Sequence, residues 1–198
     1  MTIPKPGGTS AGDLLIVAVA TDGDTSATLA PPPSWNLNSL GLGGHDGSGA
    51  VTFGVWWKIA DGAEAADVNF DWAVDGEQAY GWMMRFTGHD PSSPIATSAV
   101  TTGNLTDPIS TNLITSSDGN LILRLAGFDD DDITLDVPGL GSHNAITMDR
   151  SNTGVQNTVS GGAGYIIQST AGDTGTETYT LTAKEQYRSI TLAIRPAP

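Results

Sequence analysis

The stretch that decides the fold class is Val51-Thr-Phe-Gly-Val-Trp-Trp-Lys-Ile59. Aromatic and β-branched side chains dominate it, and such side chains are enriched in strands. Residues 14–20 form a short apolar run between Gly-Asp and Asp-Gly pairs, which is typical of a strand buried on both faces. In residues 67–72 polar and apolar side chains alternate, as in a half-buried strand. The first half of the chain therefore predicts a series of strands.

The second half of the chain repeats this pattern. Residues 120–128, 163–169 and 188–195 are predicted strands, and no window has a sustained helical period. We expect about nine to eleven strands. The predicted fold class is all-β: a two-sheet antiparallel sandwich, jelly-roll-like, in one domain that spans residues 1–198.

The two halves of the chain also resemble each other in order and spacing, which predicts an internal duplication. Gly12-Asp-Leu-Leu15 matches Gly119-Asn-Leu-Ile122 at an offset of about 107 residues, and the same offset aligns residues 58–59 with 165–166 and Tyr80 with Tyr187. We expect repeat halves at 12–88 and 119–195 that share one core, with residues 90–118 as the crossover between them.

Composition excludes several classes of protein. The net charge is −14 with only 8 Lys and Arg, whereas binding to nucleic acid needs cations that displace counterions from phosphates. There are no cysteines, so disulfides and Cys-based metal sites are excluded. Residues 1–13 lack the apolar core of a signal peptide, and the longest apolar stretch, residues 14–20, is far shorter than the roughly 18 residues of a membrane span. We therefore expect no membrane partner, and a protein that is made and kept in the cytoplasm or leaves it by a route other than classical secretion.

Six motifs along the chain carry a resemblance to a known family. They are Gly12-Asp-Leu-Leu15, Pro33-Ser-Trp35, Val55-Trp-Trp-Lys-Ile-Ala-Asp-Gly62, Arg85-Phe-Thr-Gly88, Ala171-Gly-Asp-Thr-Gly175 and Leu192-Ala-Ile-Arg-Pro-Ala197. Together they resemble a family of bacteriophage and bacterial β-sandwich proteins, mostly uncharacterised, whose members look like virion components or surface modules of larger proteins. The resemblance implies a sandwich fold and a structural role, and it supplies no catalytic residues.

No pattern in the sequence is that of a catalytic centre. There is no cysteine and no Gly-x-Ser-x-Gly nucleophile elbow. His45, His89 and His143 fall in predicted loops without metal-ligand spacing, so solvated histidines are expected. We predict that the chain is not an enzyme, with no catalytic residue and no cofactor.

The acidic residues bear on two kinds of site, a hydrolytic centre and a metal site. Glycoside hydrolysis needs two carboxyl groups about 5–10 Å apart. The glutamates flank turns or strand ends without a strand motif that would pair them, which leaves a jelly-roll hydrolase as a less favoured alternative; they are Glu64, Glu77, Glu177 and Glu185. Residues 129–132 are four aspartates, which cannot all point at one ion. We predict a solvated turn there, no metal site, and folding without calcium.

Three tryptophans form the candidate interaction surface: Trp35, Trp56 and Trp57. Trp56 and Trp57 are adjacent on a predicted strand, so their side chains face opposite ways and one must leave the shared core. That ring could cover a sheet beneath a loop, contact a neighbouring subunit, or stack on a sugar.

The expected function is that of a non-enzymatic structural protein of a bacteriophage virion, as a capsid decoration or a tail or fibre component. Its partners would be other virion proteins and copies of itself, with residues 1–11 as an extended arm that orders against a neighbour. The alternative is a carbohydrate-binding module of a bacterial surface protein, with a glycan as its ligand.

Overall fold

The computed structural model describes residues 1–23, 29, 34–36, 51–71, 78–152 and 158–198. Every element in this part of the chain is a strand, and every strand pair is antiparallel. The predicted all-β antiparallel fold class is confirmed.

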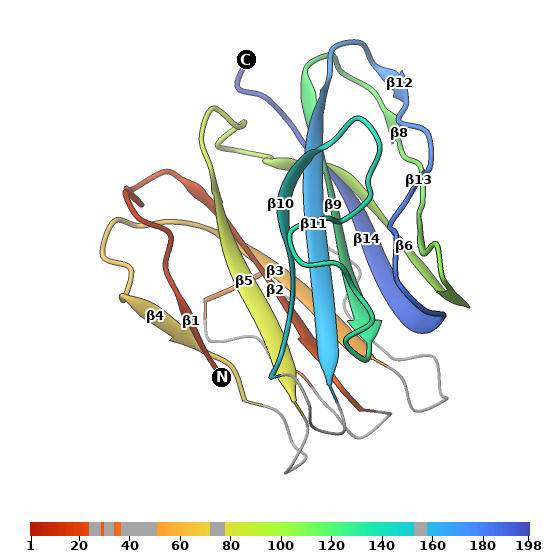
Figure 1. Ribbon diagram of the computed structural model, residues 1–198. Coiled ribbons are helices and arrows are strands. Elements are labelled where there is room, and N and C mark those ends of the chain that lie inside the picture. The colour runs from red at the N-terminus through yellow and green to blue at the C-terminus, as the bar shows by residue number, and fades with distance from the viewer. Residues whose placement is uncertain (24–28, 30–33, 37–50, 72–77, 153–157) are drawn as a thin grey trace.

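Two main sheets contain most of the strand residues (Figure 1). The smaller sheet has the order β3-β2-β5, with β3 at Thr52–Ile59, β2 at Leu14–Thr21 and β5 at Ala79–Phe86. The larger sheet has the order β10-β11-β9-β14-β6; its strands are β10 (Asn144–Arg150), β11 (Val159–Gln168), β9 (Asn120–Asp129), β14 (Glu185–Ile194) and β6 (Ile95–Leu105). No helix in the described residues is long and apolar enough to cross a membrane.

Three short ribbons complete the fold, and each pairs two segments that are far apart in the sequence. They are β1 (Thr2–Pro4) with β4 (Asp67–Asn69), β7 (Ile109–Ser110) with β13 (Glu177–Thr178), and β8 (Ile114–Thr115) with β12 (Gly172–Asp173).

The central strand β2 packs the smaller sheet against the larger one. All eight of its residues are buried, because successive side chains point to opposite faces and both faces are covered. Leu14 and Ile16 point into the core between the two main sheets, together with Leu123 and Leu125 of β9. Near one end of this core the backbone of Gly127 faces the ring of Phe53, where an added Cβ would approach the ring to within 2.9 Å. The sheets therefore approach each other closely here.

The outer face of the smaller sheet is covered by the N-terminal ribbon. Leu15 and Val17 of β2 pack there with Ile3 of β1 and Phe70, and Ile3 is buried. The amino group of Met1 donates a hydrogen bond to the carbonyl of Phe70 at 2.8 Å. The prediction of an arm that orders only against a neighbour is therefore wrong for β1, because the apolar face of this sheet offers that segment a site within its own chain.

The strand order of the smaller sheet recurs within the larger one, since β3-β2-β5 has its counterpart in β11-β9-β14. The pairing registers of these strands do not fit the single offset of about 107 residues, however. Leu14 pairs with Ile59, whereas Leu121 pairs with Ile167, one residue later than expected. The β2–β5 and β9–β14 pairs show the same one-residue shift, since Leu14 pairs with Phe86 and Leu121 pairs with Ile194.

This one-residue shift corrects part of the sequence alignment. Tyr80 packs against the core between the main sheets, whereas Tyr187 lies in a separate cluster on the outer face of the larger sheet. The alignments of Tyr80 with Tyr187 and of residues 58–59 with 165–166 are therefore wrong, because a shift of one residue moves each side chain to the other face of a sheet.

The contacts between the main sheets follow a regular pattern. β2 lies against β9, β5 against β11, and β3 against β14. A twofold axis parallel to the strands, between the two sheets, gives this arrangement when it relates β2 to β9, β3 to β11 and β5 to β14. The duplication of residues 12–88 and 119–195 stays a prediction, and this pattern is its strongest structural support.

Candidate functional site

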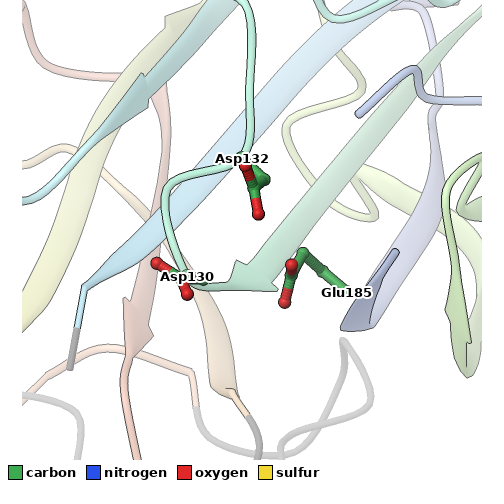
Figure 2. Close-up of side chains that lie close together, drawn as sticks. All are labelled: Asp130, Asp132 and Glu185. Atoms are coloured by element: carbon green, nitrogen blue, oxygen red, sulfur yellow. The ribbon is translucent and has the colours of Figure 1, made fainter. Parts of the chain in front are cut away.

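Three carboxyl groups meet at the turn that follows β9 (Figure 2). Asp130 and Asp132 belong to this turn, and Glu185 is the first residue of β14. One carboxylate oxygen from each residue lies within 4.8 Å of the other two. The pairing of β14 with β9 brings Glu185 to this position, although Glu185 is far from Asp132 in the sequence.

Hydrogen bonds fix the shape of this acidic turn. Asp130 has a backbone φ of 65°, and its side chain accepts a hydrogen bond from the hydroxyl of Thr158. The side chain of Asp131 forms an ion pair with Arg150, with an N–O distance of 3.1 Å. Thr182 donates a hydrogen bond to Asp132 at 3.2 Å. These contacts hold the turn, whose aspartates are exposed or half-buried at the surface.

The carboxyl groups of this cluster differ in their ionisation. Burial, followed by a hydrogen bond with Asp132 and the surrounding negative charges, raises the pKa of Glu185 to about 8. The hydroxyl of Thr158 instead lowers the pKa of Asp130. At neutral pH a proton on Glu185 therefore relieves repulsion between neighbouring carboxylates. A hard cation could replace that proton, but calcium takes six to eight oxygen ligands and these three groups supply only part of such a set.

We predict that Glu185→Gln raises the melting temperature more at about pH 8 than at about pH 5. In the unfolded chain a glutamate ionises near pH 4.5, whereas folded Glu185 holds its proton until about pH 8. The contribution of Glu185 to the free energy of unfolding is therefore fully present below the pKa that this residue has in the unfolded chain. It is lost as the pH rises through the pKa of folded Glu185. Glutamine stays neutral and removes that loss.

Thermal unfolding of the native chain and the variant at both pH values tests this prediction. The difference between the two proteins isolates Glu185, because both share the histidines that titrate in the same window. Asp136→Asn is the control, since Asp136 is exposed and lies outside the cluster. Equal changes in melting temperature at both pH values would contradict the prediction.

The three candidate tryptophans are not arranged as an exposed surface. Trp56 is completely buried and Trp35 is 7% exposed, and both pack beneath the N-terminal ribbon in the outer core of the smaller sheet. Trp57 points the opposite way and packs, half-buried, against the core between the main sheets. The prediction of opposite directions is correct, but a joint interaction surface of Trp35, Trp56 and Trp57 is wrong, because the outer face is covered by the chain itself.

The two described histidines, His89 and His143, are less exposed than the solvated side chains that the sequence predicts. His89 is buried, and burial lowers its pKa, although the neighbouring Asp13 and Asp90 charges and the backbone of Phe86 act the other way. His143 is half-buried, and burial together with the charge of Arg124 lowers its pKa. His45 lies outside the described residues, as does Glu77. The other glutamates lie apart: Glu64 pairs with Lys58, and Glu177 is on β13.

Arg124 is a buried site that the sequence reasoning missed. It points from β9 to the outer face of the larger sheet and is completely buried. Its five N–H groups all have acceptors: the Nε2 atom of His143 at 3.0 Å, and the carbonyls of Ser110, Thr111, Thr174 and Gly175 at 3.0, 3.1, 3.2 and 2.8 Å. We call these acceptors and Arg124 the arginine clamp.

The arginine clamp joins three parts of the chain. It ties the segment after β7 and the turn after β12 to the face of β9, and the neutral His143 completes the set because a protonated ring could not accept from Arg124. The sequence gives one sign of this site, namely a single basic residue within an otherwise apolar strand. The clamp is structural in character, since its donors are fully used.

A cavity of about 470 Å³ lies between the two main sheets on the side of β5. Apolar residues from both sheets line it, among them Met84, Phe86, Leu121 and Tyr165, and Arg85 borders it. Arg85 is already held by Asp13, with an N–O distance of 2.6 Å. The cavity could admit an apolar group, and it contains no constellation of polar side chains that indicates a particular ligand.

Comparison with known proteins gives no match: no family model, no curated protein and no solved structure matches this chain. The resemblance to virion β-sandwich proteins therefore stays a prediction, and the functional proposal depends on the molecule's own surfaces.

Proposed function

We propose that this chain is a non-enzymatic structural protein of a bacteriophage virion, a capsid decoration or a tail or fibre component, that works through contacts with other virion proteins and with copies of itself. The observation that supports it best is that four of the exposed large apolar side chains lie on β6 or on the short strands β7 and β8, which contact β6. They are Val100, Leu105, Ile109 and Ile114, which are 38%, 41%, 37% and 68% exposed. Exposed apolar groups at the edge of a sheet can take part in contacts with a neighbouring chain.

The way the fold covers its faces also supports this proposal. The N-terminal ribbon covers the smaller sheet, and the β7–β13 and β8–β12 ribbons lie on the larger one (Figure 1). Within the described part of the chain, sheet edges and ribbons remain for contacts with neighbours. The net charge of −14 favours a position on the outside of a particle over contact with its genome. A jelly-roll-like sandwich built from duplicated halves belongs to the same proposal.

The carbohydrate-binding alternative is less well supported, because a sugar needs an exposed aromatic platform. Trp35 and Trp56 are buried in the N-terminal ribbon's core, and Trp57 is half-buried. A glycan would have to bind elsewhere on the described surface.

Quantitative mass spectrometry of purified virions from the source phage tests the proposal. We expect the chain in many copies per particle and resistant to salt washing. Absence from particles, together with saturable binding of the purified chain to a glycan array, would overturn the proposal in favour of the carbohydrate-binding alternative.

A further inference from the structure

His143 ties the turn before β10 to the arginine clamp. The Nε2 atom of its ring accepts the hydrogen bond from Arg124 Nε at 3.0 Å, so the Nδ1 atom carries the proton of the neutral ring. The turn consists of residues 139–143, and we call it the His143 turn. Among the described residues, this is the one side-chain hydrogen bond that joins the turn to the rest of the chain. The charge of a single ring therefore bears on the position of the whole turn.

The His143 turn covers an apolar cluster on the outer face of the larger sheet. Leu140 is 5% exposed and packs there with Tyr179. The turn lies close to β11, since a Cβ added at Gly164 would come within 2.9 Å of the Leu140 side chain. Within the turn, the His143 N–H donates to the Leu140 carbonyl at a long distance of 3.4 Å. Apolar packing and the bond to Arg124 are therefore the main contacts that hold the turn in place.

The charged groups around the His143 turn come from several elements. Arg124 on β9 is a cation throughout the pH range in which a histidine titrates. Glu177 on β13 opposes it, because its carboxylate lies beside the turn, 3.0 Å from the position of a Cβ added at Gly141. The carboxylate of Asp173 on β12 already accepts hydrogen bonds from two partners. Residues 111–113, which follow β7, contribute no charge.

Protonation of His143 would remove the acceptor that Arg124 uses. The imidazolium ring has an N–H on each nitrogen, so its Nε2–H would point at the Nε–H of Arg124, and two positive charges would meet. Burial, and then the charge of Arg124, lower the pKa of His143, while Glu177 acts the other way. The buried Tyr179 hydroxyl stays neutral, because burial raises its pKa. The closed turn therefore resists a proton that a released histidine would accept.

We propose that His143 is an acid-sensitive switch: when its ring takes up a proton, the His143 turn moves away from Arg124 and uncovers Leu140, while the two main sheets stay folded. Pro138 marks the start of the movement, because its carbonyl accepts a hydrogen bond from the Thr180 N–H at 3.1 Å. Arg124 retains its four carbonyl acceptors when the turn opens, so the β7–β13 and β8–β12 ribbons remain attached. This inference is independent of the virion proposal.

Proton linkage gives the size of the effect. A released histidine has its ordinary pKa of 6.5, whereas the pKa of His143 in the closed turn is lower. The closed turn is therefore fully favoured above pH 6.5, and this advantage is lost as the pH falls from 6.5 toward the lowered pKa. Between about pH 7.5 and about pH 5 the ratio of open to closed turns should rise roughly 10- to 30-fold.

A single cysteine beneath the turn tests the proposal. The chain has no cysteine, so Leu140→Cys introduces the only thiol. The rate at which dithiodipyridine labels this thiol, divided by the rate in the urea-unfolded chain at the same pH, measures how often the turn opens. We expect this ratio to rise at least about tenfold from about pH 7.5 to about pH 5. In the double variant with His143→Gln it should change less than about twofold, because glutamine can accept from Arg124 but cannot ionise.

Val17→Cys is the matched control. Val17 is completely buried on the outer face of the smaller sheet, so its thiol is labelled only when the chain opens there or as a whole. At about pH 5 the labelling ratio for Leu140→Cys should exceed that for Val17→Cys at least about tenfold, because the turn opens without the sheets. Equal ratios for the two thiols, no rise for Leu140→Cys, or a rise that persists with H143Q would each overturn the proposal.

Hydrogen exchange replaces the thiols if Leu140→Cys unfolds the chain. At about pH 5, residues 139–146 of the native chain should exchange at least about tenfold faster than residues 14–21, with each rate taken relative to the unfolded chain, and H143Q should slow the first segment. Equal relative rates for the two segments would contradict a local opening. None of these results bears on whether virions contain the protein.

Discussion

Replacement of Arg124 by methionine should lower the free energy of unfolding by about 3 kcal/mol or more. Arg124 donates to four backbone carbonyls and one histidine nitrogen, and methionine supplies none of these donors. Two of the carbonyls, those of Thr111 and Gly175, also accept from threonine hydroxyls. Each buried acceptor left without a donor costs about 1–3 kcal/mol, partly offset where water can reach it and by the loss of a buried charge. Urea unfolding followed by tryptophan fluorescence measures the change.

Two further variants show whether the hydrogen bonds or the charge of Arg124 matter. Arg124→Lys retains the charge but has only three donors, so we expect it to recover less than half of the loss. Arg195→Met is the control, because the Arg195 side chain is 31% exposed and lies 3.9 Å from Asp90. A surface pair of this kind contributes at most about 1 kcal/mol. Equal losses for the Arg124 and Arg195 methionine variants would contradict the role given to the clamp.

Replacement of Trp56 by alanine should destabilise the chain by about 3–5 kcal/mol. Trp56 is among the largest completely buried side chains, and its ring centroid lies 5.3 Å from that of Phe70. Its ring also covers Gly54, where any side chain would overlap it. Removal of the indole leaves a cavity between the smaller sheet and the N-terminal ribbon. Thermal or urea unfolding measures the loss.

The control for Trp56 is Ile114→Ala, because Ile114 is 68% exposed and should change stability by less than about 0.5 kcal/mol. Trp56→Phe should fall between the native chain and the alanine variant, since a smaller ring fills part of the space. A Trp56→Ala variant that kept full stability but lost affinity for a partner or a glycan would contradict this prediction. It would show that Trp56 belongs to an interaction surface.

The sequence predicted the elements whose signal is local. The apolar run of residues 14–20 and the aromatic stretch at residues 51–59 became β2 and β3, and the closing strand became β14. The alignment of Tyr80 with Tyr187 is wrong by one residue, because a fixed offset of 107 does not follow the one-residue difference between the β2–β5 and β9–β14 registers. Strand pairing determines which face a side chain occupies, and pairing is not local.

The candidate sites depended on long-range contacts, which explains why they were harder to predict. One of Trp56 and Trp57 is predicted to leave the shared core, and the structure shows that it is Trp56. The β1–β4 ribbon that buries it joins residues too far apart for any periodicity to reveal. The same holds for Glu185 beside Asp132 and for the carbonyls around Arg124. Each of these groups is ordinary in its own segment and acquires its environment only when distant segments pair.

The place of β14 in the larger sheet has a consequence for folding kinetics. β14 is the last strand along the chain, yet it lies between β9 and β6, and Ile194 pairs with Ile95. Until residues 185–194 are engaged, β6 lacks the strand beside which it lies in the described sheet, and β9 lacks one of its two neighbours. Pairings between segments so distant in sequence slow folding, because the loop must close before any contact compensates for the lost entropy. The rate-limiting step is therefore expected to be the insertion of β14, and the uncharged β6 edge is most open to misassociation while that insertion is awaited.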